Sequence, residues 1–289
     1  MSNTIELAKS FVPKLDECYR LASLTSVLDG APELAKQGAN ANELIIPMMS
    51  MDGLADYSRN GGYVQGGVTM TNETVKCNFD RGRRFDVDVM DDLETAGLAF
   101  GRLSAQFIRD KVVPELDAFR FASYCGISGV TKKEETLADG AATVAALSAA
   151  VTAIDDEEVT ATGRYLFITP TLLQGINDMD TTKSKKVLEG FERVIKVPQR
   201  RFYTAIKQLS GKTGEEAGGY TKAAGAANIN FAIVQKDALI QYTKHAAPKI
   251  IAPENNPDAD AYVFGYRMVG IAKAYKNMLS GMYFSHDKA

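Results

Sequence analysis

The sequence is poor in the residue types with which proteins build catalytic and covalent sites. Its 289 residues include no tryptophan, two histidines and three cysteines. Cys18, Cys77 and Cys125 lie far apart without a CxxC pair, which argues against a disulfide framework and against a zinc site. Neither His245 nor His286 lies in a nucleophile motif with serine or cysteine, and no GxSxG occurs. We therefore expect no catalytic residue, no bound metal and no cofactor.

The sequence also lacks a long apolar run and a surplus of basic residues. No stretch approaches the ~20 apolar residues of a membrane span, and residues 1–10 show no signal-peptide pattern. We expect a soluble protein that is made in the cytoplasm. The 33 basic residues face 36 acidic ones, whereas binding to phosphates needs clustered basic residues in excess. This balance disfavours a DNA-binding module and indicates a surface near which DNA can lie without adhering.

One short motif is similar to part of a nucleotide-binding loop. Gly211-Lys212-Thr213 matches the end of a P-loop, but Ile206 stands where the motif needs its first glycine. The following residues, 214–219, are a poor start for the helix that would receive the phosphates. The pattern is typical of a solvated loop.

A cluster of arginines is followed by a cluster of aspartates. Its members are Arg81, Arg83, Arg84, Asp86, Asp88, Asp91 and Asp92. Clustered carboxylates suit a hard cation, but no glycine-bearing twelve-residue loop with a closing glutamate follows. The arginines form one small group in a slightly acidic protein, which gives little support to nucleic-acid binding. Ion pairing within the chain or to a neighbour is the favoured interpretation.

Residues 43–90 have the pattern of a long two-stranded β excursion. The run 43–51 contains Pro47, which predicts an edge strand. Three glycine turn signals follow between residues 52 and 67, and apolar and polar residues alternate from Val75 to Val89. A two-stranded excursion with so few apolar residues cannot form a core of its own. We expect it to lie on another surface.

The rest of the chain predicts a mixture of helices and strands. Asp91 is expected to cap a helix that runs to about residue 122, roughly 45 Å long, with a kink or a break at Pro114. Further helices are expected at 141–154 and from Pro170, and a loop at 124–133. Strands are expected at 165–168, 187–197, 229–234, 241–251 and 262–284. This mixed order indicates an α+β fold.

The order of these elements resembles that of the major capsid proteins of tailed phages, which have the Hong Kong 97-type fold. The resemblance covers nearly the whole chain and is architectural. It depends on the glycine-tipped excursion, on the strand–Asp-Arg-Gly–strand–acidic junction at 79–94 that runs into the long helix, and on the stretch Phe264-Gly265-Tyr266-Arg267 through Gly281-Met282-Tyr283. These resemble the family's passage from E-loop to spine helix and its closing β segment.

The resemblance implies a division of the chain into family domains. Residues 1–42 would be the N-terminal arm, 43–82 the E-loop, 83–125 the P-domain strand and spine helix, 126–255 the A-domain, and 256–289 a C-terminal β segment that returns to the P- and A-domains. Because the sequence starts with the arm, we expect either a separate scaffolding protein or a long N-terminal scaffolding region that was removed. Some members cross-link a lysine to an asparagine of a neighbour. Lys76 is the only lysine in 43–90 and lies away from the tip, so the sequence gives no support for a claim of cross-linking.

The resemblance further implies a structural protein of the virion, assembled in the host cytoplasm. Its partners would be copies of itself in hexamers and pentamers, together with a scaffolding protein, a portal and decoration proteins, around DNA that it does not bind by sequence. The expected subunit-contact residues are Leu54, Tyr57, Arg81, Arg83, Arg84, Asp86 and Asp88. Two alternatives remain: an encapsulin-like cellular compartment with the same fold, and a soluble enzyme with an unrecognised site.

Overall fold

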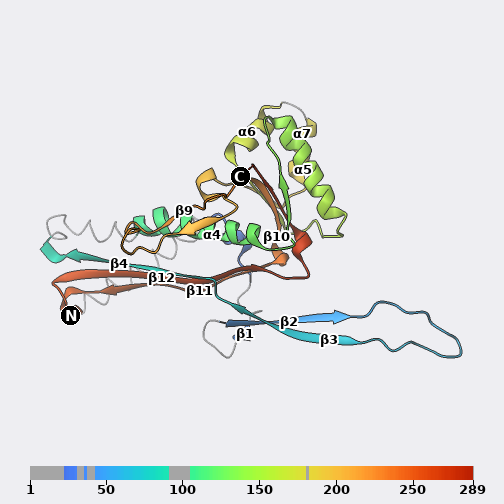
Figure 1. The fold of residues 1–289 in the computed structure, drawn as a ribbon, viewed down its shortest axis with the longest axis horizontal. Helices are drawn as coiled ribbons and strands as arrows, with labels where there is room; N and C mark the ends of the chain where they lie inside the picture. The colour runs from blue at the N-terminus through green and yellow to red at the C-terminus, as the bar shows by residue number, and fades with distance from the viewer. Residues whose placement is uncertain (1–22, 31–35, 38–42, 91–104, 180–181, 289) are drawn as a thin grey trace.

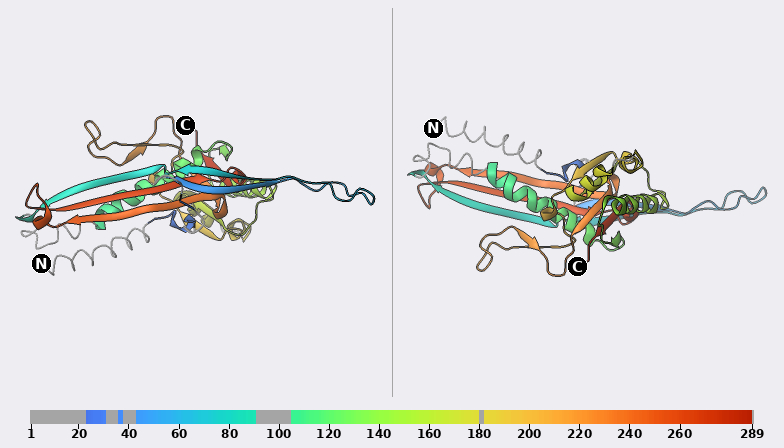
Figure 2. Two further views of the ribbon diagram at one scale, coloured as in Figure 1. Left: turned by 90° about the horizontal axis from the view of Figure 1, so that it is seen from below. Right: turned by 90° about the horizontal axis from the view of Figure 1, so that it is seen from above.

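The computed structural model describes residues 23–30, 36–37, 43–90, 105–179 and 182–288. The described chain has three parts that differ in shape (Figures 1 and 2). A five-stranded sheet flanked by helices stands above the point where a long three-stranded sheet and a β-hairpin meet. The long sheet and the hairpin extend in opposite directions from that point, so the molecule is elongated.

The five-stranded sheet is mixed. In spatial order its strands are β5 (Thr131–Glu134), β13 (Met282–His286), β10 (Ile229–Gln235), β6 (Arg164–Ile168) and β7 (Arg193–Lys196). Central β10 is antiparallel to both of its neighbours, whereas the outer strands β5 and β7 are parallel to theirs. Strands buried on both faces are expected to be apolar at every position, and β10 and β6 follow this pattern in most of their residues.

Helices cover one face of this sheet. They are α5 (Gly140–Asp155), α6 (Pro170–Asp178) and α7 (Thr182–Glu189). The alanine-rich α5 is capped by Asp139, whose carboxylate accepts a hydrogen bond from the Ala142 N–H at 2.7 Å. Alternate side chains of β6 point into two different cores: Leu166 packs with the helices, and Phe167 packs on the opposite face.

The long sheet is antiparallel, with β12 (Ala261–Ala274) between β11 (Leu239–Ile251) and β4 (Phe79–Asp88). A π-helical turn, η3 (Ile108–Val112), and the helix α4 (Val113–Gly126) lie against it. Aromatic side chains fill the space between them. Their ring pairs are Phe79 with Phe119 at 4.9 Å, Phe85 with Phe107 at 4.8 Å and Phe107 with Phe264 at 6.3 Å.

Helix α4 belongs to two hydrophobic cores at once. Val113 and Leu116 near its start pack on the long sheet, whereas Phe121 and Tyr124 near its end pack under the five-stranded sheet. The chain is helical without interruption from residue 105 to 126. The wide turn η3 directly precedes α4, whose second residue, Pro114, has no N–H to donate to the turn before it. Two abutting helices, one of the two expectations at Pro114, are therefore not observed.

The hairpin consists of β2 (Glu43–Met51) and β3 (Val68–Lys76), which are paired from end to end around a tip at residues 52–67. The two-residue strand β1 (Lys36–Gln37) pairs with the start of β2 only, and Pro47 lies beyond this pairing, at an open edge as expected. In β3 one side chain, Val75, is buried.

A second hairpin and several short helices complete the chain. The strands β8 (Ile206–Gln208) and β9 (Tyr220–Lys222) enclose the loop 209–219. The short helices are η1 (Ser26–Leu28), η4 (Gln199–Arg201), η5 (Lys236–Ala238), η6 (Pro253–Asn255) and η7 (Leu279–Gly281).

The prediction that 43–90 is one two-stranded excursion is wrong in its second half. Residues 79–88 form β4, which pairs with β12 and contributes Phe79 and Phe85 to the core beneath α4. Alternation from Val75 to Val89 shows which side chains share a face, but it does not identify the partner strand. The expected E-loop boundary at residue 82 thus falls inside a continuous strand.

Three further expectations need correction or fall outside the described residues. Residues 182–189 form helix α7 instead of the first part of a strand, because Val187 and Leu188 pack toward α5. The expected loop at 124–133 contains the end of α4 and the start of β5. The chain turns helical already at Val89, while residues 91–104 of the expected long helix lie outside the described residues.

The division into family domains stays a prediction. One topological fact bears on it: β11, which the sequence placed within the A-domain segment, pairs along its length with β12 of the long sheet. Among the described helices, none combines the length and the apolar composition needed to cross a membrane.

We predict that Gly82→Ala weakens the long sheet. A Cβ at Gly82 would meet the carbonyl oxygen of Tyr266 at 2.8 Å, so β4 and β12 would have to separate. The expected loss is roughly 1–3 kcal/mol of unfolding free energy, measured by chemical denaturation. Gly265→Ala is the matched control, because the nearest atoms to its Cβ would lie at 3.8 Å. Equal stability of the two variants would contradict the prediction.

Candidate functional site

The hairpin tip holds two of the predicted subunit-contact residues. Leu54 and Tyr57 are exposed, as are their neighbours Tyr63 and Val64. The rings of Tyr57 and Tyr63 contact each other with centroids 4.9 Å apart. The tip lies at the far end of the hairpin, away from both sheets (Figures 1 and 2). It presents an apolar surface that no other described part of the chain covers.

Arg81 is bound inside the subunit. Its Nε donates to Glu115 Oε1 on α4 at 2.8 Å, and its Nη2 donates to the carbonyl oxygens of Leu209 at 2.7 Å and Gly219 at 3.2 Å. Burial raises the pKa of Glu115, which the Arg81 cation partly offsets. One side chain thus ties β4 to α4 and to both ends of the loop 209–219.

Arg83 holds the same loop nearer its tip. Its Nη2 donates to the carbonyl oxygen of Glu216 at 2.8 Å. Gly211 and Gly218 pack against its guanidinium, where a Cβ would lie 3.0 and 2.9 Å from Nη1, and both have positive φ angles. Glycine is favoured at these positions by the backbone conformation, because an L side chain rarely adopts a positive φ.

Arg84, Asp86 and Asp88 of the charged cluster are exposed. Arg84 and Asp86 form an ion pair at 2.8 Å, and Asp88 accepts a hydrogen bond from the Met90 N–H at 2.8 Å, where the chain turns helical. The expected pairing within the cluster is therefore confirmed for one pair, while Arg81 and Arg83 turn toward the loop. Asp91 and Asp92 lie outside the described residues. The subunit-contact role stays a prediction for each residue of that set: Leu54, Tyr57, Arg81, Arg83, Arg84, Asp86 and Asp88.

The loop that is similar to a P-loop binds its own carboxylates. The Ser210 N–H donates to Glu215 Oε2 at 2.7 Å, and the Gly214 N–H donates to Glu216 Oε1 at 2.8 Å. Lys207 pairs with Glu215, and this cation together with the Ser210 N–H lowers the pKa of Glu215 to about 2. Carboxylates occupy the N–H groups on both sides of Gly211-Lys212-Thr213, and the Lys212 N–H donates to Ser210 Oγ at 3.3 Å, which supports the interpretation as a solvated loop.

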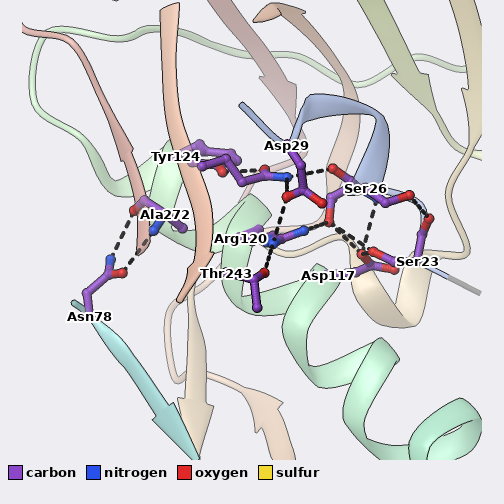
Figure 3. A network of polar contacts seen from close by, with 11 residues as sticks. Ser23, Ser26, Asp29, Asn78, Asp117, Arg120, Tyr124, Thr243 and Ala272 are labelled. Carbon is purple, nitrogen blue, oxygen red and sulfur yellow. Dashed lines mark hydrogen bonds and ion pairs between the residues drawn. The ribbon is translucent and has the colours of Figure 1, made fainter. Parts of the chain in front are cut away.

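Sequence reasoning missed a buried polar network centred on α4 (Figure 3). The Asp117 carboxylate is fully buried. It accepts hydrogen bonds from Ser23 Oγ (3.0 Å), the Leu24 N–H (3.1 Å), and the Thr25 N–H and Oγ1 (3.2 and 2.7 Å). It also forms an ion pair with Arg201 of η4 at 3.2 Å. Asp117 thereby fixes residues 23–25 to the helix.

Arg120, one turn further along α4, continues the network. Its guanidinium donates to Thr25 Oγ1 at 2.8 Å, to Asp29 Oδ1 at 3.1 Å and to Thr243 Oγ1 at 3.3 Å. The charges of Asp117 and Arg120 are thus satisfied by opposite charges and hydrogen bonds, as buried ions must be. Residues 23–29 are held to α4 and to β11 of the long sheet.

Gln241 of β11 completes this junction. Its Nε2 donates to the carbonyl oxygen of Thr25 at 2.6 Å and to Asp29 Oδ1 at 2.7 Å, and its Oε1 accepts from the Tyr124 hydroxyl at 2.6 Å. Burial raises the pKa of Tyr124, so the hydroxyl stays protonated and donates. The spacing of Asp117, Arg120 and Tyr124 on one helical face was a signal available in the sequence.

Groups suited to chemistry are scattered. His245 is exposed on β11, and His286 Nδ1 lies 2.8 Å from the carbonyl oxygen of Asp287. Burial raises the pKa of the Cys125 thiol to about 11, which makes it unreactive. Within the described ranges, no group of three or more histidine, cysteine or acidic residues could hold a metal ion.

Comparisons with known proteins identify the fold. The sequence matches no family model and no curated protein. A virus-like particle protein from Pyrococcus furiosus is 10% identical with a TM-score of 0.59, and the match covers 96% of this chain and 98% of that one. A chain from Gordonia phage Cozz is 10% identical with a TM-score of 0.59, over 93% and 87% of the two chains. A chain of the capsid structure of cyanophage P-SCSP1u is 11% identical with a TM-score of 0.55, and the match covers 87% of this chain and 85% of that one.

The chain has the Hong Kong 97-type capsid fold. The expected α+β class and the resemblance on which the expectation depended are both confirmed at the level of fold. The assignment of β2 and β3 to the E-loop and of α4 to the spine helix stays a prediction. At identities this low, the structural matches establish the architecture only. The function has to be argued from other observations.

We predict that Asp117→Ala destabilises the subunit by roughly 3–5 kcal/mol, because Arg201 would keep its largely buried charge without this carboxylate, and Ser23 and Thr25 would lose their buried acceptor. Chemical denaturation measures the loss, and hydrogen exchange at residues 23–29 should accelerate in the variant. Asp86→Ala is the control: it breaks an exposed ion pair and should leave the unfolding midpoint unchanged. Slow exchange at 23–29 in Asp117→Ala would show that other contacts hold this segment.

Proposed function

We propose that this chain is the major capsid protein of a tailed phage, which assembles with copies of itself into an icosahedral shell around the viral genome. The observation that carries the proposal is the distribution of exposed apolar side chains. Eight of the ten large exposed hydrophobic residues in the described chain lie on the hairpin: Met49, Met51, Leu54, Tyr57, Tyr63, Val64, Val68 and Met70.

This distribution argues for a partner of the hairpin. Met49 stands opposite Met70 and Met51 opposite Val68 in the β2–β3 register, so these four side chains share one face. A two-stranded hairpin with an apolar face and no core of its own is unstable in water unless that face is covered. In a shell of identical subunits the cover is another copy. Repeated contacts of this head-to-tail kind close a shell.

The fold supports the same proposal, because the solved structures that match it include capsids of phages. A structural role agrees with the scattered histidines and the unreactive buried thiol. The proposal includes hexamers and pentamers of this chain. It also includes three partner proteins, a scaffolding protein, a portal and decoration proteins, and it places the chain in the virion.

An encapsulin-like compartment is the second candidate, favoured by the match to a virus-like particle over 96% of this chain. Electron microscopy of the overexpressed protein tests both shell functions against a soluble enzyme, since shells are megadalton particles and an enzyme is a small oligomer. The contents of purified particles then separate the two shells: packaged DNA supports the capsid, and protein cargo supports the compartment.

We predict that replacing residues 52–67 with a two-residue turn leaves a folded subunit that forms no particles. The tip contributes nothing to the described cores, so the thermal unfolding midpoint should stay close to that of the original chain. Electron microscopy and size-exclusion chromatography measure assembly. Amides at 50–70 should exchange fast in free subunits and slowly in particles.

A point-mutation pair sharpens the test. Leu54→Ser with Tyr57→Ser should reduce particle yield, whereas Asp156→Ser with Glu157→Ser, at exposed positions after α5, should not. Protection of the 50–70 amides already in the free subunit would show that the hairpin belongs to its own core and would count against the proposal.

A further inference from the structure

Four places in the sequence join an asparagine or an aspartate to a following glycine. Asparagine does so once, at Asn60-Gly61, and aspartate does so at Asp29-Gly30, Asp52-Gly53 and Asp139-Gly140. Because glycine has no Cβ, its backbone nitrogen can come close to the side-chain carbonyl carbon of the preceding residue. These are therefore the positions at which the chain can most easily close a succinimide ring on itself.

Contacts in the structure restrain all three aspartates. Asp29 Oδ1 accepts hydrogen bonds from two side chains, at 3.1 and 2.7 Å. Asp52 Oδ2 accepts a backbone N–H at 2.7 Å, and Asp139 Oδ1 caps α5 at 2.7 Å. A carboxylate held by charge-assisted hydrogen bonds resists turning toward the next nitrogen. Its negative charge also makes its carbon a poor target for attack.

Asn60 is under no such restraint. It belongs to the tip of the β2–β3 hairpin, in a turn that Ser58 and Gly62 close through backbone hydrogen bonds at 3.3 and 2.7 Å. Asn60 and Gly61 are exposed, and the amide of Asn60 forms no hydrogen bond with another described residue. The amide can therefore rotate toward Gly61, and water reaches both residues.

One contact slows the attacking atom. The Gly61 N–H donates to Ser58 Oγ at 3.1 Å. Attack requires that the Gly61 nitrogen lose its proton, and an acceptor that binds this proton favours the protonated form. The bond is exposed, and a hydrogen bond that competes with water contributes little. Ser58 therefore restrains the reaction without preventing it.

We propose that Asn60 is a site of spontaneous deamidation, which Ser58 slows and which proceeds faster in free subunits than in assembled particles. The Gly61 nitrogen gives its proton to water and attacks Asn60 Cγ. The new N–Cγ bond closes the ring, and the side-chain nitrogen takes up a proton and leaves as ammonia. Water then opens the ring at either carbonyl, which yields aspartate or isoaspartate. Water is consumed and ammonia is released, and no oxidant or reductant takes part.

Both products change the tip. Each adds one negative charge to the segment 52–67, in which two aspartates already face one arginine. Isoaspartate also carries the backbone through its side chain, and the added atom disturbs the turn that Ser58 and Gly62 close. The reaction itself goes beyond the proposed function. Its dependence on assembly rests on that function, because a neighbour that covers the tip would restrict the rotation of Asn60 and the access of water.

Incubation of the purified full-length subunit at mildly alkaline pH tests the reaction. Peptide mapping by mass spectrometry should show a gain of about one mass unit at Asn60, together with isoaspartate. Ion exchange should resolve a more acidic form of the subunit that accumulates at the same rate. Asp29, Asp52 and Asp139 should form no isoaspartate over the same time.

Two variants identify the atoms involved. Gly61→Ala should slow the mass gain roughly tenfold or more, because a Cβ hinders the attacking nitrogen. Ser58→Ala should speed it roughly fivefold, the effect of removing one ordinary hydrogen bond. Ser50→Ala is the matched control, because Ser50 is exposed on β2 of the same hairpin, and it should leave the rate unchanged. No gain at Asn60, equally fast isoaspartate formation at the three aspartates, or equal rates in the original chain and its Gly61→Ala and Ser58→Ala variants overturns the inference.

A comparison of particles with free subunits tests the dependence on assembly. The mass gain at Asn60 should be roughly tenfold slower in particles. If the original chain forms shells in which Asn60 reacts as fast as in free subunits, the assembly dependence is wrong and the shell function stands. If the original chain forms no shells, the shell function and the assembly dependence both fail, whereas the mass gain in the free subunit still decides whether Asn60 is deamidated.

Discussion

The arrangement of the subunit depends on one buried carboxylate, that of Asp117. A charge removed from water must be matched by donors, and here five hydrogen-bonding groups from two separate segments, residues 23–25 and η4, converge on it. Residues 23–25, the helix α4 and the short helix η4 cannot move apart without exposing this charge to an apolar interior. Hydrogen bonds to this carboxylate need specific distances and directions. They therefore select one arrangement of the three segments among the many that hydrophobic burial alone would permit.

Helix α4 connects Asp117 to both hydrophobic cores. Its first turns pack on the long sheet and its last turns beneath the five-stranded sheet, so the residues that bind residues 23–29 also sit where the two cores meet. Gln241 of β11 and Tyr124 of α4 extend the same network to the long sheet. Arg81 likewise holds the loop 209–219 to β4 and α4, through the Leu209 carbonyl oxygen and Glu115, at a less buried site.

Much of the fold was predictable from hydrophobic pattern. Continuous apolar runs identified β6 and β10, an alanine-rich segment identified α5, and glycine signals identified the hairpin tip. The partner of β4 was not predictable, because alternation reports a shared face and not the strand that lies alongside. Helix α7 was missed since Val187 and Leu188 are adjacent and fit either period. Arg81 binds Glu115, 34 residues away, and the loop carbonyls 128 and 138 residues away, while Asp117 binds partners 84 to 94 residues away, all beyond any local pattern.

The shared helix has a mechanical consequence. Two domains joined by a flexible linker can change their mutual angle at little cost, but α4 is a structural member of both cores and the described chain is helical throughout 105–126. A force applied at the far end of the long sheet is therefore transmitted through this helix to the five-stranded sheet, and the two sheets move together. Subunits that occupy positions of different curvature in a closed surface would then keep their bodies unchanged. The bending would concentrate in the exposed β2–β3 ribbon, which has little packing to resist it.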